Sequence, residues 1–262
     1  EIQLRYFKKA LDRVRLAHAC IFYGPGEVGK MTVVKLVTKS LFCQKFQLTN
    51  DRSVVGAFDK VCEECSDCRM IESNSHPCVV LLDTEHTLLS KKEERKEIPI
   101  EDIRELKRIF SLTPPHGRWR VVIINEAEKL NYHAANAFLK LLEEPGSRAL
   151  FILITEDREL ILPTIASRAF PIRFSPLPDS VIREFLNKRM DDTAFREDMV
   201  KFAAGRPGVA IRLAENREAF ARERRLASEV GSLLKGGIPE ALRLSQRLAE
   251  DSVLRPKAVE YL

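Results

Sequence analysis

The chain has 262 residues, of which 45% are hydrophobic and 31% are charged, and its formal net charge is +5. This composition supplies a large core and argues against a disordered chain, and the small net charge does not require a nucleic-acid partner. No window approaches the roughly 18 uninterrupted apolar residues of a membrane span, and no apolar signal core follows a basic start. We therefore expect a cytoplasmic protein without a membrane partner.

The first 175 residues alternate between short β-branched runs and amphipathic stretches, a pattern typical of a parallel α/β sheet. The predicted strands cover residues 20–23, 79–82, 121–124, 150–154 and 172–174. The predicted helices between them cover residues 30–42, 100–110 and 131–144. The uninterrupted apolar run at 121–124 indicates a strand buried on both faces.

A proline-containing linker at residues 175–178 separates this part from a region that is helical throughout. The expected helices there cover residues 180–189, 197–204, 209–225 and 239–249. We therefore predict a first domain over 1–176 and two helical segments over 177–215 and 216–262.

A glycine-rich segment lies between the first predicted strand and the first predicted helix. It reads Gly-Pro-Gly-Glu-Val-Gly-Lys at residues 24–30, which is the P-loop pattern in its proper strand–loop–helix context. Such a loop cradles phosphates with backbone N–H groups while its lysine reaches the terminal phosphates. A plain glycine-rich turn is the alternative, which this context disfavours. The expected nucleotide-binding residues of the loop are Gly24, Pro25, Gly26, Gly29 and Lys30.

Two positions directed at Mg²⁺ lack the usual oxygen ligands. A working P-loop has Ser or Thr after the lysine, but here Met31 follows it, and a thioether is a poor ligand for a hard cation. After the strand at 121–124, Asn125 stands where the usual acidic ligand belongs. Glu126 stands where the water-activating base belongs. We therefore expect a degenerate site, with a vestigial base and doubtful binding of ATP and Mg²⁺.

The cysteines predict a metal site. Cys62, Cys65 and Cys68 are spaced as Cys-x₂-Cys-x₂-Cys in a polar stretch, and four thiolates can close a structural zinc site. Cys43, at the end of the helix after the P-loop, is our choice for the fourth ligand, with Cys78 and His76 as rivals. Free buried cysteines are the alternative, and Cys20, which lies in a predicted strand, is expected in the core.

Taken together, these motifs resemble the clamp-loader family of bacterial DNA polymerase III, which comprises AAA+ proteins of the delta-prime and gamma/tau types. The stretches that carry the resemblance are residues 18–25, the cysteine set followed by His76-Pro77, residues 121–130 and residues 135–145. Their order and spacing match, and the resemblance covers about residues 3–215. It implies a RecA-like α/β AAA+ domain over 1–176 with a zinc module inserted at about 43–78. It also implies a helical lid over 177–215 and, over 216–262, the start of a helical collar that continues further in the family.

One more segment belongs to this resemblance. Residues 162–168 are similar to the family's Ser-Arg-Cys segment, with Ala169 in place of the cysteine. The resemblance implies that Arg168 reaches across to the ATP of a neighbouring subunit, where a guanidinium can stabilise phosphate charge. Taken alone, Arg168 would be an ordinary surface arginine.

The departures at Met31 and Asn125 resemble the delta-prime type, whose members do not hydrolyse ATP. The implied function is that of a fixed ring member, not an ATPase by itself, which helps load the sliding clamp onto primed DNA within the polymerase holoenzyme. The implied partners are gamma/tau and delta subunits, the clamp and DNA. Two alternatives stay open: an active gamma/tau-type ATPase, and a zinc-dependent nucleic-acid-binding module.

Overall fold

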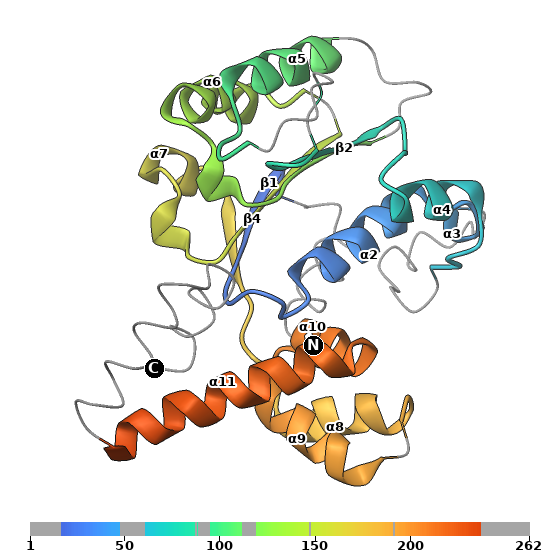
Figure 1. Ribbon diagram of the computed structural model, residues 1–262. Helices are drawn as coiled ribbons and strands as arrows, with labels where there is room; N and C mark the ends of the chain where they lie inside the picture. Colours follow the sequence, from blue (N-terminus) through green and yellow to red (C-terminus); the bar gives the residue numbers. More distant parts are fainter. Residues whose placement is uncertain are drawn as a thin grey trace. The chain divides into compact units, whose positions relative to one another are not determined.

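The computed structural model of the chain describes residues 17–47, 61–86, 88, 95–111, 119–146, 148–190 and 192–236. The chain divides into two compact units, Glu1–Pro176 and Leu177–Leu262. The first unit holds a sheet with helices, and the described part of the second unit holds helices (Figure 1). The helix predicted for residues 239–249 lies outside the described residues.

The sheet of the first unit has five described strands in the order β2-β3-β4-β1-β5, and every neighbouring pair is parallel. The strands are β1 (Ala19–Tyr23), β2 (Val79–Leu82), β3 (Arg120–Ile124), β4 (Ala149–Thr155) and β5 (Phe170–Arg173). The five predicted strands and the parallel α/β fold are therefore confirmed, with strand ends that differ by at most two residues.

The central strands are apolar at nearly every position, apart from Arg120 at the start of β3 and Thr155 at the end of β4, because both of their faces are buried. Successive side chains of a strand point to opposite faces, so neighbours in β4 join different cores. Phe151 and Leu153 belong to one core, whereas Leu150 and Ile152 belong to the other. All seven residues of β4 are buried.

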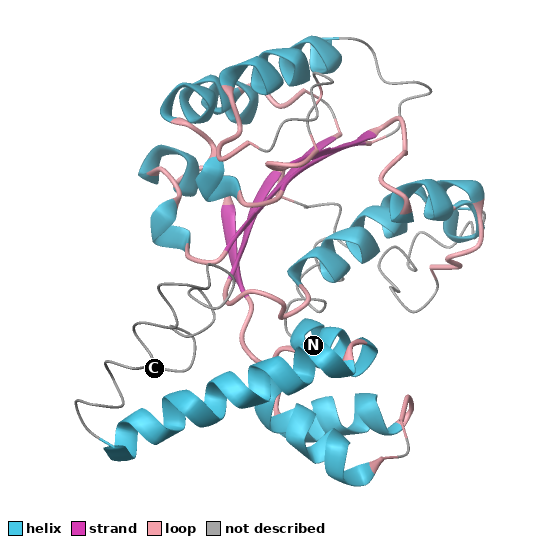
Figure 2. Ribbon diagram, viewed as in Figure 1, coloured by secondary structure: helices cyan, strands magenta, loops and turns pink. Residues whose placement is uncertain are grey.

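Helices cover both faces of the sheet (Figures 1 and 2). One face carries α5 (Ile100–Ser111), α6 (Tyr132–Glu143) and the short α7 (Pro163–Ala166). The other face carries α2 (Lys30–Phe42), with α3 (Gln44–Gln47) and α4 (Ser66–Glu72) beyond its end. Two 3₁₀ turns, η4 (Ala127–Lys129) and η5 (Arg158–Leu160), follow β3 and β4.

Local chemistry accounts for the bounds of α6. The side chain of Asn131 accepts a hydrogen bond from the N–H of Ala134 at 2.9 Å, which satisfies one of the free donors at the helix start. Pro145 follows closely after the last residue of the helix, where it cannot continue the hydrogen-bonding pattern. The helix that was predicted for residues 131–144 is therefore confirmed with slightly narrower bounds.

The second unit contains α8 (Asp179–Asn187), α9 (Thr193–Ala203), α10 (Pro207–Glu215) and α11 (Arg217–Gly236). Their apolar faces share one core, which includes Ile182, Leu186, Met199, Val200, Leu213 and Phe220. No helix in the described part of the chain is both long and apolar enough to cross a membrane.

The prediction of one continuous helix over 209–225 is wrong. The helix is interrupted at Asn216, whose backbone is extended at φ −134° and ψ 92°, and α11 begins at the next residue. The helical spacing of apolar residues continues across this interruption, because Leu213 of α10 and Phe220 of α11 bury their side chains in the same core. An ion pair of 2.7 Å between Arg212 and Glu223 also links the two helices.

Candidate functional site

The P-loop follows β1 at the carboxyl edge of the sheet. Tyr23, the last residue of β1, pairs with Thr155 of β4 on one side and with Arg173 of β5 on the other. The helix after β1 lies on one face of the sheet, whereas the helix after β4 lies on the opposite face (Figure 1). In open α/β sheets, ligands bind outside the carboxyl ends of the strands at such a reversal.

Two glycines of the loop have backbones that other residues would not tolerate. Gly24 has φ +140°, and a Cβ atom there would lie 2.1 Å from the carbonyl oxygen of Phe174, the residue that follows β5. Gly29 has φ +92° and precedes α2 directly. Close approach of β5 thus requires the first glycine, and the turn into the helix requires the second.

Lys30, the first residue of α2, is buried and folds back onto its own loop. Its Nζ donates to the carbonyl oxygen of Pro25 at 2.7 Å and also to that of Gly24. Burial lowers the pKa of Lys30, and the nearby carboxylates of Glu156 and Glu128 act in the opposite direction. Two of the three N–H donors of the ammonium are therefore used by the loop itself.

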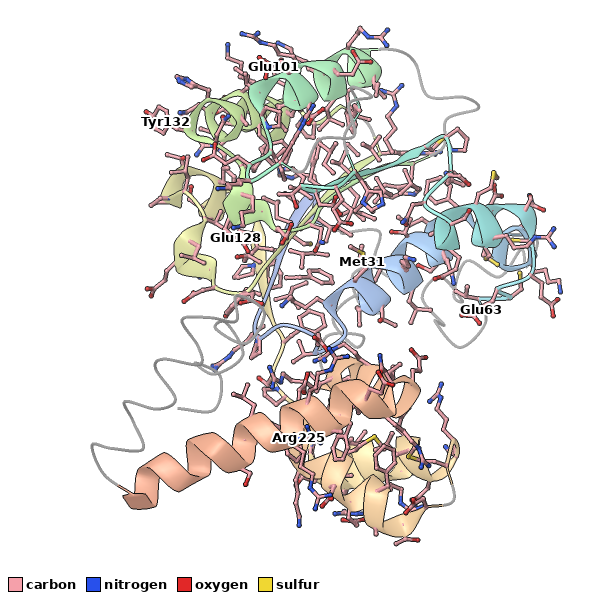
Figure 3. All side chains as sticks on the ribbon, viewed as in Figure 1. Met31, Glu63, Glu101, Glu128, Tyr132 and Arg225 are labelled. Atoms are coloured by element: carbon pink, nitrogen blue, oxygen red, sulfur yellow. The ribbon has the colours of Figure 1, made fainter. Side chains whose placement is uncertain are left out.

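Met31 and Asn125 stand at the two positions that usually bind Mg²⁺, and neither has an acidic or hydroxyl side chain. Met31 is half-buried on α2 and packs against the apolar core on that face (Figure 3). Asn125 follows β3, and its backbone N–H donates to the carbonyl of Leu82 at 2.8 Å. A thioether in an apolar core and an amide at the strand end offer no anionic oxygen to a magnesium ion.

Glu126 is held in place by a side chain that the sequence had not singled out. Its Oε2 accepts a hydrogen bond of 2.9 Å from the hydroxyl of Thr84, which follows β2. Its backbone is left-handed at φ 53°, a conformation uncommon for residues other than glycine. Two residues on, at Glu128 (labelled in Figure 3), Oε2 is buried and has no hydrogen-bond partner among the described residues.

Glu156 is a further residue of this edge that sequence reasoning missed. It stands directly after β4, and its carbonyl accepts a 3.0 Å hydrogen bond from the N–H of Gly24. Its position after a buried strand was a usable signal, since residues that follow parallel strands meet at one edge. The sequence alone did not show that β4 is the neighbour of β1.

The four predicted cysteines form one cluster beside the end of α2. The sulfurs of Cys43, Cys62, Cys65 and Cys68 all lie within 4.8 Å of one another, and those of Cys43 and Cys62 are 3.5 Å apart. A tetrahedral site with Zn–S bonds of about 2.3 Å separates its sulfurs by roughly 3.8 Å. The set can therefore hold a metal ion, and its four thiols fit zinc (Figure 3, where Glu63 in the same loop is labelled).

The thiols of this cluster differ in acidity. The pKa of Cys62 is lowered to about 6, first because the backbone N–H of Cys65 donates to its sulfur at 3.4 Å. Burial raises the pKa of Cys68 instead. A thiolate at Cys62 is thus already favoured by the loop, whereas the buried thiol needs a cation beside it to ionise.

The rival ligands lie outside the sulfur cluster. Cys78 is buried and packs in the core next to the sheet. His76 accepts the N–H of Cys78 at its Nδ1 and lies with its Nε2 3.3 Å from Asp67, and its ring packs against Phe42. Since both ring nitrogens have partners and the ring is buried, His76 is a structural residue that ties α4 to the start of β2.

Arg168 lies at the opposite edge of the sheet from the P-loop. It precedes β5 by two residues, and β5 is parallel to β1, so Arg168 is at the amino edge while residues 24–30 are at the carboxyl edge. Its guanidinium contacts the carbonyl of Thr164 and the carboxylate of Glu143, both at 3.0 Å. This arginine is therefore remote from the P-loop of its own chain.

A family model described as DNA polymerase III, delta subunit, matches residues 1–178. The chain belongs to the DNA polymerase III clamp-loader family. The delta' subunit of Pseudomonas aeruginosa is 31% identical over 204 residues, and that of Bacillus subtilis is 32% identical over 189 residues. The gamma subunit of Buchnera aphidicola is 31% identical over 186 residues, so both branches of the family are similar to this chain.

The matches to the two delta' subunits cover 77% and 71% of this chain but 57% and 51% of those proteins. The chain thus spans about half the length of these relatives. Among solved structures, a gamma subunit-related protein from Thermotoga maritima matches with a TM-score of 0.50 and 22% identity, over 92% of this chain and 64% of that one. This likeness supports the AAA+ fold of the family.

Proposed function

We propose that the chain is a non-hydrolysing, delta-prime-type member of the DNA polymerase III clamp loader. It would help to load the sliding clamp onto primed DNA and would present Arg168 to the ATP of a neighbouring gamma/tau subunit. Its other partners would be the delta subunit, the clamp and DNA. Residues 177–215 would act as the family's lid, and residues 216–262 would begin its collar.

The observation that carries this proposal is the state of the two Mg²⁺ positions. Met31 contributes to an apolar core, and Asn125 offers an amide where an acidic ligand is usual. Phosphoryl transfer depends on a metal that bridges the phosphates and neutralises their charge. Loss of both ligands leaves Lys30 and the loop glycines as a phosphate cradle that lacks the residues to hold a magnesium ion.

The position of Arg168 supports the second half of the proposal. It lies at the edge of the sheet opposite to its own P-loop, on a partly exposed surface, and its guanidinium is already oriented by acceptors on Thr164, Ser167 and Glu143. A positive charge that is oriented at an outer edge could stabilise the phosphate charge of a nucleotide held by another subunit.

The cysteine cluster supports a structural role for zinc in the same protein. Cys43 comes from the end of α2, whereas the other three thiols come from the loop before α4 and from α4 itself. A zinc ion bound to all four would fasten this insertion to the helix that follows the P-loop. We propose no catalytic part for the metal.

ATP turnover tests the proposal directly. The purified chain should hydrolyse ATP at the background rate, and Glu126→Gln should leave that rate unchanged. Robust hydrolysis by the wild type that disappears in Glu126→Gln would instead establish the active gamma/tau type. That alternative is favoured by the retained Lys30 and Glu126 and by the similarity to gamma subunits.

A zinc-dependent nucleic-acid-binding module is the alternative of another class. The cysteine cluster favours it, because small zinc modules commonly serve nucleic-acid recognition. Tight binding of DNA by the chain alone, with an affinity that falls steeply as salt is added, would support it. Weak DNA binding that needs the other clamp-loader subunits supports our proposal.

A further inference from the structure

The side chain of Glu156 lies against the P-loop. A Cβ atom built on Gly26 would be only 2.8 Å from Oε1 of Glu156, so the carboxylate occupies the space next to the loop backbone. The backbone of the same residue holds the loop through its hydrogen bond with Gly24. Its place at the end of β4, beside β1, therefore delivers a negative charge to the loop.

Carboxylates also act on the charge of Lys30, the lysine of the P-loop. Among the described residues, the carboxylates of Glu156 and Glu128 attract this lysine and favour its charged form. The lysine in turn donates to the carbonyls of Gly24 and Pro25. The cation that would meet a phosphate thus already interacts with two carboxylates and is hydrogen-bonded within its own loop.

We propose that Glu156 is a specificity residue that excludes polyphosphates from this P-loop. A triphosphate that entered the loop would bring several negative charges next to the carboxylate of Glu156 and would compete with it for the charge of Lys30. The inference rests on the degenerate P-loop of the proposed function, but it names a separate barrier. Missing Mg²⁺ ligands weaken metal-dependent binding, whereas this carboxylate opposes phosphates whether or not a metal is present.

The experiment compares Glu156→Gln with the wild type, using inorganic tripolyphosphate in EDTA and ATP in EDTA as probes in calorimetric titrations. Glutamine keeps the size of the side chain and removes its charge. We expect both probes to bind about fivefold more tightly to the variant, the upper end of an exposed charge interaction, and we expect the gain to shrink at high salt. Adding Lys30→Ala should remove the gain, because the anion then loses its cation.

Glu159→Gln is the matched control. Glu159 is an exposed glutamate of η5, three residues further along, and its charge has no part in the environment of Lys30. The Glu159→Gln variant should bind both probes with the affinity of the wild type. Thermal unfolding should show that both variants are folded, since the bond from Gly24 is to the backbone of Glu156 and survives the substitution.

Equal affinities in Glu156→Gln and the wild type, or binding below detection in both, would overturn the inference. An equal gain in Glu159→Gln would also overturn it, because the effect would then reflect net charge alone. These outcomes are independent of the ATP-turnover test, since the probes are measured without metal and without hydrolysis. A wild type that hydrolyses ATP would refute the proposed function by its own measurement.

Discussion

Arg168 and Glu143 form an ion pair between the segment after α7 and the last residue of α6. Nη2 of the arginine donates to Oε1 of the glutamate at 3.0 Å, while Nη1 donates to the carbonyl of Thr164. Both side chains are about half exposed, so the pair orients the guanidinium without burying it. The same contact that fixes the direction of Arg168 therefore leaves it available to another molecule.

Replacement of Arg168 by alanine should affect the assembled complex and spare the isolated chain. An exposed ion pair contributes little, so the free energy of unfolding should stay within about 0.5 kcal/mol of the wild type. In a reconstituted clamp loader, the clamp- and DNA-stimulated ATPase should fall by about tenfold or more, because the neighbouring site loses a transition-state cation. Arg168→Lys should rescue poorly, since an ammonium lacks the planar fork.

Unchanged turnover and unchanged clamp loading in a correctly assembled Arg168→Ala complex would reduce this residue to an ordinary surface arginine.

Glu143→Ala should slow the same stimulated ATPase by about two- to fivefold, less than the loss of Arg168 itself. The arginine would keep its charge and its contacts to Thr164 and Ser167 but would sample other rotamers once the carboxylate of Glu143 is gone. Lys188 and Glu184 make an exposed pair in the second unit, and Glu184→Ala is a suitable control that should leave turnover unchanged. A faster ATPase in Glu143→Ala would show that the glutamate competes with phosphate for Arg168.

The protein should contain about one zinc ion per chain when it is purified without chelator. Cys43→Ser should lose the metal and lower the midpoint of thermal unfolding by at least about 2 °C, because the ion links α2 to the following loop. Cys78→Ala, which removes a buried thiol outside the cluster, should keep the metal. Metal analysis of the three proteins decides the matter, and zinc retained in Cys43→Ser would reassign the fourth ligand.

In metal-free protein, Cys62 should react with iodoacetamide before the other thiols. Its pKa is lowered to about 6, so its thiolate should persist at neutral pH and the rate should fall as the pH drops through about 6. Cys20 is the internal control, because burial raises the pKa of its thiol to about 12. Peptide mapping of the alkylated sites over pH 5–8 measures both, and equal labelling of the two at neutral pH would contradict the assignment.

Restoring both metal positions should make nucleotide binding depend on Mg²⁺. Met31→Thr with Asn125→Asp should raise ATP affinity by about tenfold in Mg²⁺ over EDTA, which corresponds to about 1.4 kcal/mol. The threonine should also lower the free energy of unfolding by about 1 kcal/mol, because Met31 packs against the core. Titrations with each single variant provide the controls, and an affinity that ignores the metal would show that the loop geometry no longer supports a magnesium site.

The strands and the main motifs were determined by the sequence itself. An apolar run such as residues 121–124, flanked by polar segments, can satisfy its backbone and bury both faces only as an inner strand of a covered sheet. The P-loop pattern at residues 24–30 depends on local glycine conformations and on the helix start that follows. These features need only neighbours in the chain, so their periodicity and spacing were enough to predict them.

The tertiary structure decided which distant segments of the chain lie in contact. The order β2-β3-β4-β1-β5 places β4 beside β1 and so brings Glu156 to the P-loop, and no local pattern encodes that order. The same packing gathers Cys43 with three thiols that begin 19 residues later, and it lets α10 and α11 share a core despite the break at Asn216. Such contacts depend on how buried surfaces fit together in space, which is why they became visible only when the sheet order and the helix packing were known.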